Sequence, residues 1–222
     1  MTDTLTTPRA SLFDWDNTLV DTWPVIHEAL NVTMRDMGAE EWSLERVKRD
    51  VKRSMRESFP ELFGDDWEDA ARIYQDAYRA VHLERLKPLP GSEATLQYIA
   101  TKTDVFCGLV SNKRGPSLRT ELKHLGWEPH VHVAVGAGDA AHDKPDIAPM
   151  LHALKDSGMM PGPDVWFVGD TTVDLECANA GNATSILYGP VTPDGHIYEG
   201  VPFAHHVVDQ AALLQLLKQH LG

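Results

Sequence analysis

Short apolar runs alternate with helix-like segments from residue 92 to residue 188, and this alternation constrains the fold more than any other feature. Strands buried on both faces, as in parallel sheets, are apolar along their whole length. Strands that alternate with helices predict right-handed crossovers, with helices on both faces of the sheet. The expected fold class is therefore α/β, with a Rossmann-like parallel-sheet core in three layers, α/β/α. The expected strands are 105–110, 131–135, 165–168 and 184–188, and the expected helices are 92–101, 116–125, 147–156, 172–180 and a last one that Asp209 caps and that runs to Leu221.

A further strand is expected at 10–15, and a long helical segment separates it from the rest of the alternation. No strand is apparent between Asp21 and Lys87. The segment 86–91 is rich in proline and closed by glycine, which is typical of a hinge or a domain boundary. The sequence therefore predicts a core domain of residues 1–20 and 88–222 and an inserted all-helical domain of residues 21–87. Its three helices are expected from Trp23 to Gly38, from Ser43 to Pro60, which ends the second, and from about Asp66 to Val81.

Two aspartates, Asp14 and Asp16, follow the first apolar run. Residues two apart on a strand point the same way, so both carboxylates can reach one place at the end of the strand. Two carboxylates held together repel unless one keeps its proton or a cation lies between them, and Mg2+ prefers oxygen ligands of this kind. A metal-dependent acid/base site is the first hypothesis. The structural alternative is an Asx-turn that leaves the strand, with Thr18 as a cap.

Polar residues also follow three of the other expected strands. A parallel sheet binds ligands outside the carboxyl ends of its strands, so these residues belong to one edge. Each has a structural explanation of its own, such as a turn serine, a solvated lysine or acids at a helix N-terminus. Their coincidence at one edge favours a single functional site. The residues are Ser111 and Asn112 after 105–110, Lys144 after 131–135, and Asp170 and Asp174 after 165–168.

This set, in this order, resembles the haloacid dehalogenase-like superfamily: D-x-D-x-T, then Ser, then Lys, then G-D-x-x-x-D. The resemblance covers essentially the whole chain. Residues 21–87 resemble the helical cap of that superfamily, and residues 89–92, Leu-Pro-Gly-Ser, resemble the return into the core in phosphoglycolate-phosphatase-like members. Asn17 stands where many members carry Gly, which we interpret as tolerated because Asn also adopts unusual turn conformations.

The resemblance implies a Mg2+-dependent phosphatase that hydrolyses a small phosphorylated metabolite, either phosphoglycolate-like or a sugar phosphate. Asp14 is then the nucleophile and forms an aspartyl-phosphate. Asp16 protonates the departing alkoxide and afterwards activates water. Lys144 neutralises charge on the transferring oxygens. The metal site implied comprises Asp14, Asp16 through its main-chain carbonyl, Asp170, and Asp174 as an outer or water-mediated contact that orients Lys144 or the metal.

Phosphate binding is expected from Ser111, Asn112, Thr18 and Lys144, helped by backbone N–H groups of the first motif. Relatives that displace halide lack the second acid, so Asp16 favours phosphoester hydrolysis. One alternative is a phosphomutase of the same superfamily, which would return the phosphoryl group to its substrate. Another is a non-catalytic protein that binds Mg2+ or phosphate as an interaction module.

The formal charge of −13 argues against a nucleic-acid polymer or an anionic membrane as partner, because both need a basic face. The segment Met1–Arg9 is polar and lacks the apolar core of a signal peptide. Cys107 and Cys177 lie in apolar runs, which favours buried free thiols in a reducing, cytoplasmic environment. We expect a monomer or a homodimer. The eleven histidines show no metal-ligand spacing.

A basic run lies inside the expected helical insertion: Arg46, Arg49, Arg53 and Arg56 at near-helical spacing. A solvated helix face is the favoured interpretation. The alternative is that one or two of these arginines meet a second anionic group on the substrate. Trp23 can line the same substrate cavity as these arginines, although packing within the insertion is its favoured role.

Overall fold

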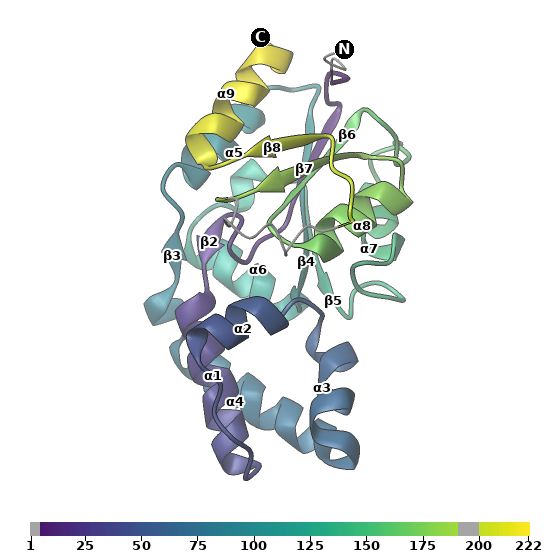
Figure 1. Cartoon of the computed structure of the whole chain (residues 1–222). Helices are drawn as coiled ribbons and strands as arrows, with labels where there is room; N and C mark the ends of the chain where they lie inside the picture. The colour runs from purple at the N-terminus through teal and green to yellow at the C-terminus, as the bar shows by residue number, and fades with distance from the viewer. Residues whose placement is uncertain (1–4, 191–199) are drawn as a thin grey trace.

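The chain is described by a computed structural model that covers residues 5–190 and 200–222, so residues 1–4 of the polar N-terminal segment lie outside it. A six-stranded parallel sheet forms its centre, in the order β5-β4-β1-β6-β7-β8 (Figure 1). This confirms the predicted α/β class. The strands are β1 Ala10–Phe13, β4 Phe106–Arg114, β5 Val133–Ala137, β6 Val165–Gly169, β7 Thr184–Tyr188 and β8 His205–Val207.

Helices cover both faces of the sheet, because the strands are apolar on both sides. Every residue of β1, β6 and β7 is buried. One hydrophobic cluster joins one face to α5, α6 and α9, and a second joins the opposite face to α7 and α8. The predicted three layers are therefore present. The helices are α5 Ser92–Ala100, α6 Gly115–His124, α7 Ala148–Leu154, α8 Thr172–Ala180 and α9 Gln210–Leu221.

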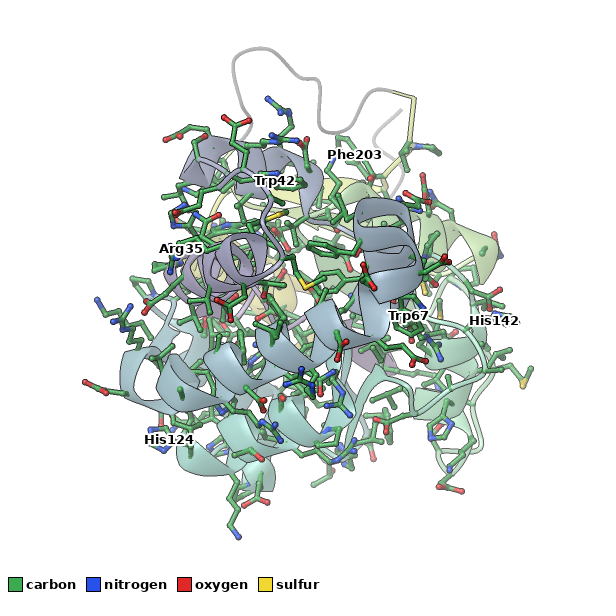
Figure 2. All side chains as sticks on the ribbon, turned by 90° about the horizontal axis from the view of Figure 1, so that it is seen from below. Arg35, Trp42, Trp67, His124, His142 and Phe203 are labelled. Carbon is green, nitrogen blue, oxygen red and sulfur yellow. The ribbon has the colours of Figure 1, made fainter. Side chains whose placement is uncertain are left out.

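A group of helices between β1 and β4 packs around its own hydrophobic cluster, separate from the two that flank the sheet. Figure 1 shows these helices beyond one end of the sheet, and Figure 2 views the molecule from that side, with Trp42 and Trp67 apart from one another. Within the described part of the chain, no helix is long and apolar enough to cross a membrane. The helices are α1 Trp23–Asp36, α2 Leu44–Asp50, α3 Met55–Phe63 and α4 Trp67–Arg85, with a 3-10 turn Gly64–Asp66 before α4.

The chain enters and leaves this helical group through two short strands that pair with each other. β2 (Val20–Asp21) is antiparallel to β3 (Lys87–Pro88). The sequence analysis found no strand here, because two residues are too few for any period to be recognised. The edge strand β8 was missed for a related reason: it contains His205 and His206 and has no apolar run.

The second helix of the insertion differs from the prediction. Residues 51–54 interrupt it, with Val51 in an extended conformation and Ser54, also extended, preceding α3. Pro60 was expected to end the helix, but it lies inside α3, which ends at Phe63 and is followed by Gly64 with φ +57°. A proline inside a helix removes one backbone hydrogen bond, and the residue before it, Phe59, packs into the insertion's core.

Candidate active site

The polar residues expected at the strand ends surround one cavity of about 490 Å³, which lies between the edge of the sheet and the helical insertion. Apolar side chains of the insertion form much of its remaining wall, including Trp23, which also packs against the insertion's own core. The strand ends thus bring together residues up to 160 positions apart. The expected residues that line the cavity are Asp14, Asp16, Ser111, Asn112, Lys144, Asp170 and Asp174.

Lys144 joins two of the aspartates. Its Nζ donates to Asp14 Oδ1 at 2.8 Å and to Asp174 Oδ1 at 2.6 Å, and its side chain is 2% exposed. Burial disfavours the charged ammonium, but the Asp14 and Asp174 carboxylates outweigh burial and raise the pKa of Lys144 above its usual value. The buried lysine therefore carries its positive charge.

Asp14, Asp170 and Asp174 form a cluster in which one carboxylate oxygen of each lies within 4.8 Å of those of the other two. Burial, together with the Asp174 and Asp16 carboxylates, raises the pKa of Asp14 to about 6 against the lowering effect of Lys144. Burial and the charges of Asp14 and Asp174 raise the pKa of Asp170 well above its usual value. The cluster thus holds more negative charge than Lys144 neutralises. Its donors are all oxygens, so the residues fit a hard divalent cation such as Mg2+.

Both carboxylate oxygens of Asp174 accept hydrogen bonds from protein groups. Oδ1 accepts from Lys144, and Oδ2 accepts from the Thr171 N–H at 3.0 Å and the Thr171 hydroxyl at 2.7 Å, closing a capping box at the start of α8. A Cβ at position 169 would lie 2.3 Å from the Asp174 Cβ, so only glycine fits there. The geometry supports the expected outer role of Asp174, which holds Lys144 in place.

Thr18 differs from the other expected residues, because it is completely buried and is not among the residues that line the cavity. Its hydroxyl donates to Asp170 Oδ1 at 3.1 Å, and its main-chain carbonyl accepts from Gln210 Nε2 at 2.7 Å. The residue expected to contact phosphate therefore contacts a carboxylate instead. This position suits it to orient Asp170.

Asn112 also contacts a neighbour rather than facing the cavity with unused donors. Its Nδ2 donates to the main-chain carbonyl of Lys144 at 2.9 Å, and its Oδ1 accepts from the Lys144 N–H at 2.9 Å. This reciprocal pair fixes the backbone of Lys144 against the end of β4. Ser111 is different: its Oγ accepts from the Lys113 N–H at 3.2 Å, which leaves its hydroxyl hydrogen available for a further bond.

The turn after Asp14 explains the asparagine at position 17. Asn17 has φ +60°, in the left-handed region, and its Oδ1 accepts from the Thr22 N–H at 3.3 Å. Asn tolerates this conformation better than other residues with a side chain. The expectation that Asn can replace Gly here is confirmed. β1 itself ends at Phe13, two residues before the expected end, and the chain turns at residues 17–19.

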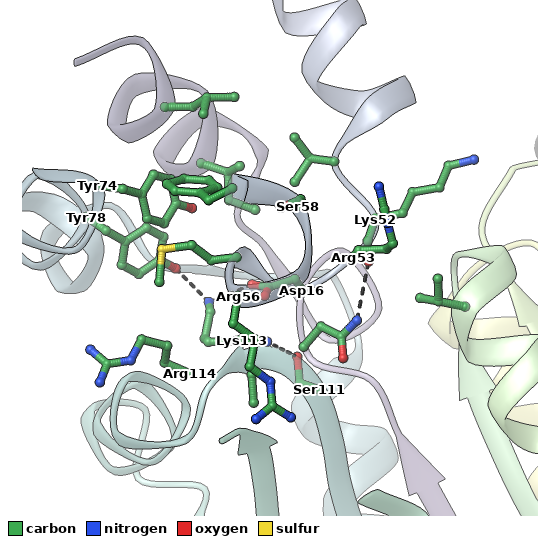
Figure 3. Close-up of a pocket in the computed structure, with 18 of the residues that line it drawn as sticks. Asp16, Lys52, Arg53, Arg56, Ser58, Tyr74, Tyr78, Ser111, Lys113 and Arg114 are labelled. Atoms are coloured by element: carbon green, nitrogen blue, oxygen red, sulfur yellow. Dashed lines mark hydrogen bonds and ion pairs between the residues drawn. The ribbon is translucent and has the colours of Figure 1, made fainter. Parts of the chain in front are cut away.

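Lys113 was given no role in the sequence analysis, yet it is the residue that holds Asp16. Its Nζ donates to Asp16 Oδ1 at 2.6 Å and contacts Tyr78 (Figure 3). It also contacts Glu121. Lys113 follows Ser111 and Asn112 at the same strand end, so its position was a usable signal. Its contacts with Asp16 and Tyr78 could not be predicted, because those residues are 97 and 35 positions away in the sequence.

The four arginines of the basic run separate into two pairs. Arg46 and Arg49 pair with the nearby Asp50 and do not line the cavity. Arg53 pairs with Glu61, and Arg56 binds Asp143 through two bonds of 2.5 and 2.7 Å; both of these arginines line the cavity. The continuous helical face imagined for this run is wrong, since residues 51–54 interrupt the helix.

The two cysteines are free and buried, as expected. Burial raises the pKa of both thiols to about 12. Neither is among the residues that line the cavity, so the thiols take no part in the site.

Comparison with known proteins identifies relatives along most of the chain. The sequence profile described as haloacid dehalogenase-like hydrolase matches residues 11–188. A protein named phosphoglycolate phosphatase from Xylella fastidiosa is 31% identical over 190 residues, covering 81% of this chain and 80% of that protein. One of the same name from Aquifex aeolicus is 29% identical over 195 residues, covering 85% and 89%.

Solved structures show the same fold. A haloacid dehalogenase-like family hydrolase from Streptococcus pneumoniae superposes with a TM-score of 0.81 at 19% identity, and the match covers 95% of this chain and 98% of that one. At this identity the likeness concerns the fold alone.

Proposed function

The chain belongs to the haloacid dehalogenase-like hydrolase family and is a phosphatase of that family, and from this premise we propose that it uses Asp14 as a nucleophile on a small phosphate monoester. One observation carries the proposal. Asp14 and Asp16 line the same cavity, and each is held by its own buried lysine, Lys144 at 2.8 Å and Lys113 at 2.6 Å. Two acids fixed separately can perform two different tasks on one substrate.

In the first step, an oxygen of the Asp14 carboxylate forms a bond to phosphorus while the bond from phosphorus to the leaving oxygen breaks. Asp16 gives its proton to that oxygen, so the product leaves as an alcohol. In the second step, Asp16 takes a proton from water as the water oxygen attacks the phosphorus of the aspartyl-phosphate. Inorganic phosphate leaves, and the Asp14 carboxylate and the protonated Asp16 are restored.

Bringing an anionic nucleophile to an anionic phosphate needs positive charge in the cavity. Each pair of unit charges at about 4 Å costs about 4 kcal/mol at an effective dielectric of about 20. Lys144 provides one compensating charge, and Ser111 donates a hydrogen bond to a phosphate oxygen. Asp14, Asp170 and the main-chain carbonyl of Asp16 would hold Mg2+, with Thr18 orienting Asp170. When bound, the ion adds charge stabilisation at the phosphoryl oxygens.

We assign the choice of substrate to the helical insertion, taken as a cap of residues 21–87 on a core of residues 1–20 and 88–222. The charged groups at the strand ends contact only a phosphoryl group, so the rest of a substrate must face the insertion. Curated relatives carry the name phosphoglycolate phosphatase, which makes phosphoglycolate the first substrate to test, followed by sugar phosphates.

Replacing Asp14 tests the proposal directly. We expect Asp14→Asn to lower kcat at least about a thousandfold on any phosphate ester that the wild type hydrolyses. Acid-quenched wild type mixed with labelled substrate should carry covalent phosphate, and Asp14→Asn should carry none. The matched control is Asp104→Asn, at an exposed position, which should keep wild-type activity.

Substantial activity in Asp14→Asn would reject the nucleophile assignment. Product analysis provides a second check, because a phosphatase releases free inorganic phosphate. An isomerised sugar phosphate in place of inorganic phosphate would identify a mutase instead.

A further inference from the structure

Lys113 lies at the centre of a buried hydrogen-bond network that the steps above do not explain. Its Nζ donates to Asp16 Oδ1 at 2.6 Å and to the Tyr78 hydroxyl at 2.6 Å (Figure 3). It also donates to Glu121 Oε2 at 2.7 Å. A lysine ammonium has three N–H donors, so these bonds use all of them. The side chain is 5% exposed. Lys113 therefore has one orientation, and it fixes one oxygen of Asp16.

Glu121 anchors the far side of the network. This completely buried carboxylate accepts from Trp15 Nε1 at 2.7 Å and from the Tyr78 hydroxyl at 2.9 Å, and it lies 2.7 Å from His82 Nδ1. Trp15 stands between the two acids in the sequence, so the network holds the backbone between Asp14 and Asp16 as well as the Asp16 side chain. A buried carboxylate with so many donors cannot move without leaving several of them unpaired.

The network also connects the two parts of the molecule. Tyr78 and His82 project from α4 of the insertion, whereas Glu121 lies on α6 and Lys113 at the end of β4, both in the sheet-bearing part. The Lys113 Nζ also lies 5.0 Å from the centre of the Tyr78 ring. Asp16 is thus held by a network that contains groups from both parts of the molecule.

We propose that Lys113 is the positioning residue for Asp16, and that α4 completes this arrangement through Tyr78. The inference rests on the proposed function, because it takes Asp16 as the proton donor. Lys113 donates to Oδ1, so the proton that Asp16 delivers is carried on Oδ2. After transfer to the leaving oxygen, the same Oδ2 accepts a proton from water in the second step.

Positioning of a proton donor matters most when the leaving group is a strong base. Phenyl phosphate and p-nitrophenyl phosphate have nearly the same shape, but the phenolate is far more basic than the nitrophenolate. Phenyl phosphate therefore needs the proton from Asp16 more. A residue that only supports the fold would affect both substrates equally.

Lys113→Met removes the ammonium and keeps the length of the chain. We expect it to lower kcat/KM about ten- to a hundredfold more for phenyl phosphate than for p-nitrophenyl phosphate, since general acid catalysis contributes about a hundredfold or more. Tyr78→Phe should also lower kcat/KM more for phenyl phosphate than for p-nitrophenyl phosphate, but by a smaller factor. It provides the test of the proposal if Lys113→Met does not fold. The matched control is Lys123→Met, an exposed lysine of α6, which should leave the ratio unchanged.

Combining Lys113→Met with Asp16→Asn tests whether Lys113 acts through Asp16 or only supports the fold. In the Asp16→Asn variant, adding Lys113→Met should leave the ratio of the two kcat/KM values where Asp16→Asn alone puts it. Equal losses on both substrates in folded Lys113→Met and Tyr78→Phe would overturn the proposal. If Asp14→Asn is inactive while this ratio does not move, only the role of Lys113 fails. Activity that survives in Asp14→Asn would instead reject the proposed function itself.

Discussion

Asp14 shows most directly how the site handles charge at the scale of single residues. Its carboxylate is buried beside two further acids, and Lys144 is the cation that contacts it. The result is a pKa of about 6, above the usual 3.8. A group of this kind binds a proton readily when no other cation is near, so protons and metal ions compete for it.

This competition predicts how Mg2+ affinity depends on pH. Because the pKa of Asp14 lies at about 6, Mg2+ must displace a proton below pH 6 and meets the free carboxylate above it. We expect the dissociation constant to rise at least tenfold for each pH unit by which the pH falls below 6. Calorimetric titration of the protein with Mg2+ at pH 5, 6, 7 and 8 measures this. Equal affinity at pH 5 and 7 would contradict it.

The sequence predicted the groups that line the cavity better than it predicted their contacts. Asp14, Ser111 and Asp170 each follow an apolar strand closely, so the topology of a parallel sheet was enough to bring them together. The contacts of Thr18 and Asn112 could not be predicted. Both were expected to face phosphate, and both contact other site residues, because hydrogen-bond partners depend on side-chain packing rather than on position along a strand.

At the scale of elements, the pairing of α4 with α6 depends on a buried charge. Although burial opposes it, the charge of Lys113 and hydrogen bonds from His82, Lys113 and Trp15 lower the pKa of Glu121 to about 2, from the usual 4.5. A carboxylate with a lowered pKa stabilises the folded state above its unfolded pKa, and this contribution is lost as the pH falls.

The corresponding prediction concerns the free energy of unfolding. At pH 7, Glu121→Gln should be less stable than wild type by on the order of 3 kcal/mol. The difference should shrink as the pH falls from about 4.5 toward 2, where wild-type Glu121 becomes protonated as well. Urea unfolding of both proteins from pH 7 to pH 3 measures it. The opposite effect of the raised Asp14 pKa is common to both proteins and cancels.

Glu93→Gln, at an exposed position of α5, is the matched control and should show no such trend. A difference between wild type and Glu121→Gln that stays constant with pH would show that the network does not depend on the charge of Glu121.

Elements themselves were predicted well where an apolar period was long enough to recognise. α8 was expected at 172–180 and is observed there, and the last helix begins after Asp209, whose side chain accepts from the Ala212 N–H at 2.8 Å. The break at residues 51–54 was missed, because no Gly or Pro marks it and apolar residues continue at helical spacing across it. Only packing against the rest of the insertion reveals that the helix is interrupted.

At the scale of the whole molecule, the insertion and the sheet-bearing part also meet through Arg56 and Asp143. The Asp143 carboxylate is 1% exposed, directly precedes Lys144 and accepts two bonds from Arg56 of α3. Arg49 binds Asp50 in a similar two-bond arrangement, but that carboxylate is 34% exposed. These two arginines therefore form a natural pair for comparison.

We expect Arg56→Gln to lower the free energy of unfolding by about 1 to 3 kcal/mol, because it leaves the buried Asp143 carboxylate without its charged partner. Arg49→Gln should change it by less than about 1 kcal/mol, since water solvates Asp50. Urea unfolding at pH 7 compares the two variants. Equal losses of unfolding free energy in the two variants would show that the burial of Asp143 does not determine how much its ion pair contributes to stability.

The pairing of β2 with β3 has a consequence for exchanging parts between relatives. The polypeptide leaves the sheet-bearing part and returns to it at neighbouring positions, so a foreign segment of another length could be grafted there without stretching either junction. A chimera built this way would inherit the acids and Lys144 from its host. It would have to bring its own counterparts of Tyr78 and His82, or the graft would fold and yet leave Asp16 poorly held.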